Sequence, residues 1–184
     1  MESQKEIYSD TNFPERLFVL GAGPSLELLY PYREEMDKWG YWAVQRSDLV
    51  QPFLDFTDPL YTIRYFHPPE RSHHVDPKTY GINLQNTLGD VKSGGSIGAF
   101  ISHFQKFGGK ELFLFGYDGT NTGYWRGQSP TWCAKWNAVA VYKRDSDDMN
   151  KRNWGSTKLY HLGKTNNNFM TEISIAELME LKRC

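Results

Sequence analysis

A glycine-rich turn follows the first apolar run of this 184-residue chain, where LFVL (17–20) leads into GAGPS. The turn consists of Gly21, Ala22, Gly23, Pro24 and Ser25. Glycine lets a ligand approach the main chain closely, and proline suits the first position of a helix. A strand that turns into a helix presents free N–H groups and a positive dipole end to an anion. The turn therefore predicts a phosphate site, while a plain connection without a ligand stays open.

Neither of the two common phosphate-binding motifs matches this turn. A dinucleotide-binding G-x-G-x-x-G turn needs a small residue where Leu26 stands, and no clear acidic residue ends the next predicted strand. The G-x-x-x-x-G-K-[ST] pattern of P-loop proteins is absent. The turn therefore predicts an anion site without selecting a nucleotide.

A second glycine-rich segment, SGGS (93–96), precedes another helical pattern. Ser93 and Gly94 would add hydroxyl and N–H groups at a second helix start, unless the segment is only a flexible connector. Open α/β sheets bind ligands beyond the carboxyl ends of their strands. Two such helix starts in one small domain therefore predict a shared cleft.

Asp118 ends the apolar strand pattern ELFLF, after Gly116 and Tyr117. A carboxylate at the carboxyl end of a strand projects toward such a cleft. It can contact a ribose, hold a Mg²⁺ that bridges phosphates, or act as a general base. A purely structural carboxylate in the turn is the remaining interpretation.

Trp125 and Arg126 belong to an aromatic stretch that can bind substrate. Aromatic rings can line a sugar or a base, and a guanidinium can bind an acid group. A lid that merely covers the sheet explains them equally well. The D-x-D spacing of residues 145–148 lies among basic residues and is typical of a solvated charge run. His73 and His74 have no third ligand at a suitable spacing, so we predict no metal site.

Alternating strand and helix patterns predict an α/β fold. The expected strands are residues 17–20, 41–46, 61–66, 80–86, 111–118 and 157–163. The expected helices follow Pro24, cover residues 93–109, and close the chain from Ile173 to Lys182 with Ser174 as N-cap.

These elements fit a single Rossmann-like domain over residues 1–184, with a mostly parallel sheet and helices on both faces. Residues 1–15 are expected to form a loose arm. Residues 119–156 are expected to form an insert or lid over the ligand end of the sheet. This insert carries one helix, with Ser129-Pro130 as its expected start.

The composition excludes several classes of function. The net charge is −1, from 21 basic and 22 acidic residues, so nothing supports binding to polymeric nucleic acid. The two cysteines, Cys133 and Cys184, form neither a disulfide framework nor a metal site. No apolar run reaches membrane-spanning length, and the N-terminus has no hydrophobic signal segment. We therefore expect a cytoplasmic protein without a membrane span.

GAGPSLELL and the later SGGSIGAFISHFQKFGGKELFLFGYDG resemble the bacterial sialyltransferases that use CMP-sialic acid. The segments are also similar to flagellin-modifying glycosyltransferases and to the archaeal hydroxymethylpterin pyrophosphokinase. Those proteins share a G-x-G-P-S-L turn, a Ser-Gly helix start and a strand that ends in Gly-x-Asp. The closing KLYHLG and ISIAEL resemble their last strand and helix. The resemblance covers most of residues 17–178, except the insert and the 67–79 loop.

The resemblance implies a nucleotide-sugar-dependent glycosyltransferase, with a CMP-activated acidic sugar as donor. Residues 21–25 would then meet the nucleotide phosphate or ribose, Ser93 and Gly94 would line the same cleft, and residues 116–118 would frame the base and sugar. Two alternatives stay open. One is a Mg²⁺-dependent pyrophosphokinase that acts on a small heterocycle with ATP, and the other is a catalytically silent nucleotide-binding module. Mg²⁺ is the only cofactor among these alternatives.

The chain departs from this family pattern at three places. Ala22 stands where the sialyltransferases carry Asn, and Gln45-Arg46-Ser47 stands near another Asn of the family. No histidine lies between residues 104 and 160, where the family has its general base. His161 falls inside a predicted strand, which is typical of a hydrogen-bonded core histidine. Any catalysis is therefore expected to depend on Asp118 or on the insert.

Overall fold

The computed structural model describes residues 14–44, 47–56, 62–66, 80–83, 95–119, 123–127 and 138–181. Seven strands of this part form one sheet in the order β4-β3-β2-β1-β5-β6-β7, and every pairing is parallel. The strands are β1 (Arg16–Leu20), β2 (Tyr41–Val44), β3 (Thr62–Phe66), β4 (Tyr80–Asn83), β5 (Glu111–Phe115), β6 (Lys158–Leu162) and β7 (Thr171–Ile173). The predicted α/β fold is confirmed.

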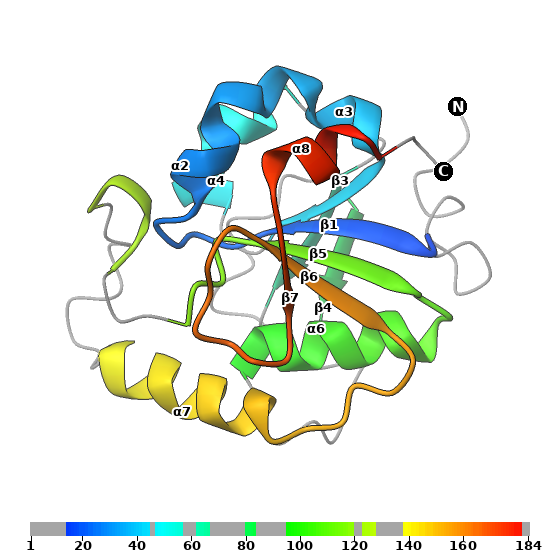
Figure 1. Ribbon diagram of the computed structural model, residues 1–184, viewed down its shortest axis with the longest axis vertical. Helices are drawn as coiled ribbons and strands as arrows, with labels where there is room; N and C mark the ends of the chain where they lie inside the picture. The colour runs from blue at the N-terminus through cyan, green and yellow to red at the C-terminus, as the bar shows by residue number, and fades with distance from the viewer. Residues whose placement is uncertain are drawn as a thin grey trace.

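Helices cover both faces of the sheet (Figure 1). One face carries α2 (Leu26–Leu29), the 3₁₀ helix η1 (Tyr30–Glu35), α3 (Met36–Trp39), α4 (Ser47–Leu54) and α8 (Ile175–Met179). The opposite face carries α6 (Gly95–Lys106) and α7 (Ala138–Asn150). The fold is therefore a three-layer arrangement, as parallel sheets buried on both faces require.

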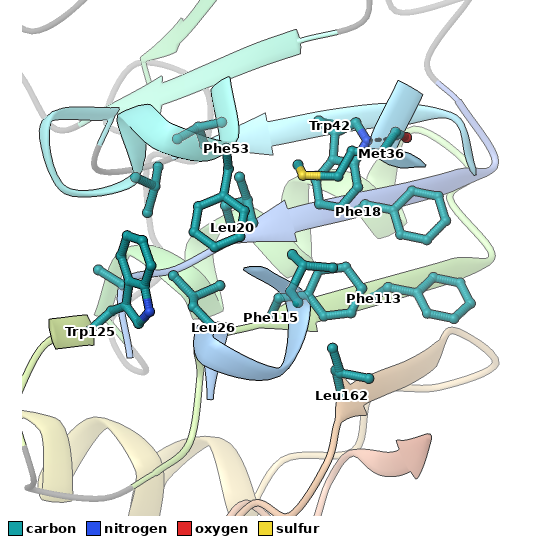
Figure 2. Close-up of a cluster of buried hydrophobic side chains, with 14 of the residues drawn as sticks. Phe18, Leu20, Leu26, Met36, Trp42, Phe53, Phe113, Phe115, Trp125 and Leu162 are labelled. Carbon is teal, nitrogen blue, oxygen red and sulfur yellow. Dashed lines mark hydrogen bonds between the residues drawn. The ribbon is translucent and has the colours of Figure 1, made fainter. Parts of the chain in front are cut away.

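The alternation of side chains along β1 produces two separate cores. Leu17 and Val19 point to the face covered by α6, whereas Phe18 and Leu20 point to the face covered by α2. All four are fully buried, which explains why this strand reads as a continuous apolar run. Figure 2 shows the core that contains Phe18 and Leu20.

Aromatic rings in register cross four adjacent strands on this second face. Phe18 of β1 stacks on Trp42 of β2, with ring centroids 5.1 Å apart, and on Phe113 of β5 at 4.8 Å. Phe113 stacks in turn on Tyr160 of β6 at 4.7 Å. Such cross-strand pairs fix the register of the sheet. They also fix the positions at which the strands end at the candidate site.

The last helix begins later than predicted, and two further elements were not expected. Ile173 lies in β7, so the last helix begins after Ser174 and not at Ile173. The predicted N-cap is confirmed, because Ser174 forms a capping box with Glu177. Neither β7 nor α4 was expected. β7 is only three residues long and α4 contains Pro52, so neither gives a clear periodic pattern.

The strand order reverses between β1 and β5. The chain runs outward from β1 through β2 and β3 to β4, then crosses to the other side of β1 and continues through β5, β6 and β7. The crossing passes through α6, which packs under β1 and β5. This reversal is a topological switch point, where open α/β sheets have their ligand crevice.

The expected insert contributes two described pieces. The 3₁₀ helix η4 (Trp125–Gly127) contacts the glycine turn after β1. The backbone N–H of Trp125 donates to the Ala22 carbonyl oxygen at 2.7 Å. The helix α7 lies on the α6 face of the sheet (Figure 1), where Met149 joins the α6 core. Ser129-Pro130, the expected start of the insert helix, and the loose arm expected at residues 1–15, apart from residues 14 and 15, lie outside the described residues.

Candidate functional site

The candidate site lies where β1, β5 and β6 end. The turn after β1 is joined to the end of β5 by three hydrogen bonds. Gly21 N–H donates to the Phe115 carbonyl (2.7 Å), Gly23 N–H to the Gly116 carbonyl (2.9 Å), and Ser25 N–H to Asp118 Oδ2 (3.2 Å). The predicted proximity of the two segments is therefore present. However, these three N–H groups are used within the protein and are not free to bind a phosphate.

The glycines of the turn are explained by its contact with β5. A Cβ at Gly23 would lie 2.2 Å from Asp118 Oδ2 and 2.6 Å from the Gly116 carbonyl oxygen. A Cβ at Gly21 would lie 2.8 Å from the same carbonyl and 2.8 Å from the Tyr117 ring. No side chain fits at either position. Close packing of protein on protein therefore accounts for the glycines, without a ligand.

Ser25, Asp118 and His161 form a cluster at the ends of the three strands. Ser25 Oγ lies 3.4 Å from His161 Nε2, and Asp118 Oδ1 lies 3.5 Å from the same nitrogen. The other ring nitrogen, Nδ1, lies 3.2 Å from the carbonyl oxygen of Gly163. His161 is fully buried, and the Asp118 side chain is 10% exposed. The prediction of a buried, hydrogen-bonded histidine is confirmed, but its contact with Ser25 and Asp118 was not foreseen.

Burial lowers the pKa of His161 below its usual value of 6.5, against the opposing effects of the Gly163 carbonyl and the Asp118 and Glu172 carboxylates. At a pH between 6.5 and the lower pKa of His161 in the folded state, this histidine binds more protons in the unfolded chain than in the folded chain. We therefore expect the free energy of unfolding to fall as the pH drops below about 6.5.

Urea unfolding between about pH 8 and about pH 5 measures this effect, and His161→Gln should flatten the profile. The carboxyl groups of Glu27 and Glu177, whose pKa values are lowered, lose their stabilising effect only below their usual 4.5 and do not interfere in this range. An equal slope in the parent and the variant would show that His161 is not responsible.

The backbone around Asp118 is held by the segment that follows β6. Thr165 Oγ1 donates to the carbonyl oxygens of Tyr117 (3.2 Å) and Asp118 (3.3 Å), and Asn166 N–H donates to that of Asp118 (2.9 Å). Asn167 Nδ2 donates to the Tyr117 carbonyl at 2.8 Å. These residues were not predicted from the sequence. Their signal is the polar run KTNNN directly after a predicted strand.

The acidic run 145–148 lies in α7 and contains one buried group. Ser146 is 8% exposed, and its hydroxyl donates to Asn167 Oδ1. Because Asn167 also binds the Tyr117 carbonyl, α7 is tied to the strand end that carries Asp118. The solvated charge run predicted here therefore has one buried serine, which contacts the segment after β5 through Asn167.

Trp125 and Arg126, the predicted substrate-binding residues, are both engaged with protein groups. The Trp125 side chain is 1% exposed and packs in the core of Figure 2, and its indole N–H donates to Glu27 Oε2 at 2.7 Å. Arg126 donates to both carboxylate oxygens of Glu27, at 3.0 and 2.9 Å, and its guanidinium lies 4.1 Å from the centre of the Tyr30 ring. These contacts fit the alternative interpretation, a cover attached to α2.

The Glu27 carboxylate is the centre of this second cluster. Hydrogen bonds from Arg126 and then from Trp125 lower the pKa of Glu27 to about 2. Arg126 has φ +54°, the only positive φ among the non-glycine residues of the described chain. The bidentate ion pair therefore holds Arg126 in a backbone conformation that non-glycine residues rarely adopt.

The remaining predicted groups lie outside the described residues or lack a counterpart there. Ser93, Gly94, His73 and His74 are not described. Within the described ranges, no group of three or more His, Cys, Asp or Glu side chains could hold a metal ion. Nor does that part of the chain contain a helix long and apolar enough to cross a membrane.

Comparison of the chain with protein-family models, with curated proteins and with solved structures finds no match. Functional assignment therefore depends on the geometry of the site and on the sequence resemblance.

Proposed function

We propose that the protein binds a nucleotide at the carboxyl edge of its sheet and is a transferase that uses a nucleotide-activated sugar. The observation that carries this proposal is the reversal of strand order between β1 and β5. Ligands of open α/β sheets lie outside the carboxyl ends of the strands at such a reversal. The glycine turn and Asp118 both belong to this edge.

The start of α6 is the better candidate for contact with the phosphate. α2 has only four residues, and the N–H groups of Gly21, Gly23 and Ser25 before it are donated within the protein. α6 has 12 residues and therefore a longer row of aligned peptide dipoles. Ser93 and Gly94 directly precede it in the sequence. A phosphate near the start of α6 would lie at the carboxyl edge of the sheet, near the reversal between β1 and β5.

The sugar donor and the transfer step are inferred from the resemblance to sialyltransferases. A CMP-activated acidic sugar is the first candidate donor. Asp118 is not well placed to act as a base by itself, because Oδ2 accepts from Ser25 N–H and Oδ1 faces His161. This engagement of Asp118 favours one second candidate, a module that binds nucleotide without turnover.

Thermal unfolding with CMP, CDP, UDP, GDP and ATP, each with and without Mg²⁺, tests nucleotide binding. A ligand at about a hundred times its Kd stabilises the folded state by about 2.7 kcal/mol. For a chain of this length, that corresponds to a rise in Tm of about 5–10 °C. Cytidine is the matched control, because it has the base and the ribose of CMP but no phosphate.

If no nucleotide raised the Tm, the proposal would be contradicted. If cytidine raised the Tm as much as CMP does, the phosphate would not contribute to binding. Release of CMP from CMP-sialic acid, measured by chromatography, then separates the transferase from the silent module. Stabilisation by ATP only in the presence of Mg²⁺ would instead support a pyrophosphokinase.

A further inference from the structure

We propose that Ser25 carries an activated hydroxyl group, whose proton is accepted by His161 while Asp118 stabilises the resulting imidazolium. The three side chains come from the ends of β1, β6 and β5, and they meet at the carboxyl edge of the sheet. The three groups form a catalytic site, and the proton transfer from Ser25 to His161 is independent of which ligand the edge binds.

The polarity of the hydrogen bonds follows from the Gly163 carbonyl. A carbonyl oxygen only accepts, so the Nδ1 atom of His161, 3.2 Å away, carries the ring proton of the neutral imidazole. Nε2 then has a free lone pair, and Ser25 Oγ at 3.4 Å is a hydroxyl that can donate to it. Burial, which lowers the pKa of His161, favours this neutral, proton-accepting form.

The interaction of the Asp118 carboxylate with His161 becomes favourable only after the proton has moved to Nε2. Its Oδ1 lies 3.5 Å from Nε2, where a lone pair of neutral histidine gives no hydrogen bond. Once Nε2 carries the proton, the same distance separates an imidazolium from a carboxylate. Asp118 therefore stabilises the product of the transfer over the reactant. This differs from a Ser-His-Asp triad, in which the carboxylate binds the opposite nitrogen.

The position of Ser25 leaves its hydroxyl available. Ser25 stands at the N-cap of α2, yet its side chain forms no capping hydrogen bond. Its backbone is fixed by the bond from its N–H to Asp118 Oδ2. His161 is fully buried, whereas Ser25 is partly exposed. Among these two side chains, a reactant at the edge can therefore contact the serine hydroxyl but not the buried imidazole.

An activated serine hydroxyl can attack an electrophilic phosphorus: Oγ forms the new bond, the hydroxyl proton passes to Nε2, and the leaving group departs with its electron pair. In the proposed transferase, Ser25 would relay a proton, and this role rests on the proposed function. The acceptor hydroxyl would lose its proton to Ser25 Oγ as Ser25 passes its own to His161. The acceptor oxygen would bond to the sugar carbon, and the nucleotide phosphate would leave with the electrons of the broken C–O bond.

The first experiment labels the protein with a fluorophosphonate and identifies the modified residue by peptide mass spectrometry. We expect Ser25 to be labelled, at a rate that rises with pH and levels off above the pKa of His161. His161→Gln should lower this rate about a hundredfold or more, as expected for loss of a general base. Asp118→Asn should also lower it. An unlabelled Ser25, or an unchanged rate in His161→Gln, would overturn the inference.

A second experiment leaves His161 in place, in case its replacement disturbs folding. Ser25→Cys puts a thiol beside the imidazole, and Ser156→Cys puts one at an exposed position as the matched control. Alkylation by iodoacetamide over a range of pH should show the thiol pKa in Ser25→Cys at least one unit below that in the control, because a thiolate pairs with an imidazolium. An equal or higher pKa would overturn the inference. Neither assay contains a nucleotide, so failure of the proposed function would leave both results interpretable.

Discussion

Replacement of Trp125 by alanine is expected to lower the free energy of unfolding by about 3–5 kcal/mol, the usual cost of removing a large buried aromatic side chain. The Trp125 ring is 1% exposed and lies 5.0 Å from the Phe53 ring and 5.5 Å from the Tyr30 ring, measured between centroids. Its indole N–H also binds Glu27. Urea unfolding monitored by far-UV circular dichroism measures the loss.

Two variants serve as controls. Trp125→Phe keeps an aromatic ring in the core and loses the hydrogen bond to Glu27, so it should cost clearly less than the alanine variant. Leu28→Ala removes an apolar side chain that is 48% exposed and should have little effect. A Trp125→Ala variant as stable as Leu28→Ala would show that η4 is not part of the core.

The consequence for function concerns the glycine turn. The backbone N–H of Trp125 donates to the Ala22 carbonyl, so η4 holds the turn in addition to β5. A loss of ligand binding in Trp125→Ala would therefore not by itself identify Trp125 as a substrate contact. Arg126→Ala is the better probe of a direct contact, because its side chain is 45% exposed.

The fold could be predicted wherever packing leaves a local pattern. β1 and β5 are buried on both faces and read as continuous apolar runs, and α6 shows its buried residues Ile97, Phe100 and Phe104 at helical spacing. The end of α6 could also be predicted, because a glycine commonly follows the last turn of a helix in the left-handed conformation, and Gly108 has φ +82°. Elements held mainly by long-range packing gave no such pattern, and β7 was missed for that reason.

The site was predictable only in part. The sequence predicts that the turn after β1 and the residues after β5 lie at the same edge, because parallel strands end together. It gives no sign that His161 faces Ser25, since that contact joins residues 136 positions apart and depends on the register of β5 and β6. The ion pair of Glu27 with Arg126 spans 99 positions and was hidden for the same reason.

The reason why residue 23 is a glycine could not be predicted from the sequence either. A glycine next to a proposed phosphate site suggests room for a ligand, whereas the described structure fills that room with Asp118 and the Gly116 carbonyl. Gly23→Ala is therefore expected to lower the free energy of unfolding by about 3 kcal/mol, the upper end of the usual cost of overpacking, and Gly23→Val by more. Backbone must move in both variants, because one of the obstructing atoms is a carbonyl oxygen 2.6 Å away.

Gly155→Ala is the matched control for this prediction. Its Cβ would meet no atom within 4 Å, so the variant bears only the strain of a side chain at φ +60°, about 1–2 kcal/mol. Urea unfolding of the three variants should give the order Gly23→Val, Gly23→Ala, Gly155→Ala, from the least to the most stable. A Gly23→Ala protein as stable as the parent would show that the turn can separate from β5, and the space beside Gly23 would then be open to a phosphate. A large loss would mean that reduced nucleotide binding in Gly23 variants reports the integrity of the β1–β5 edge, so direct phosphate contacts have to be sought at the start of α6.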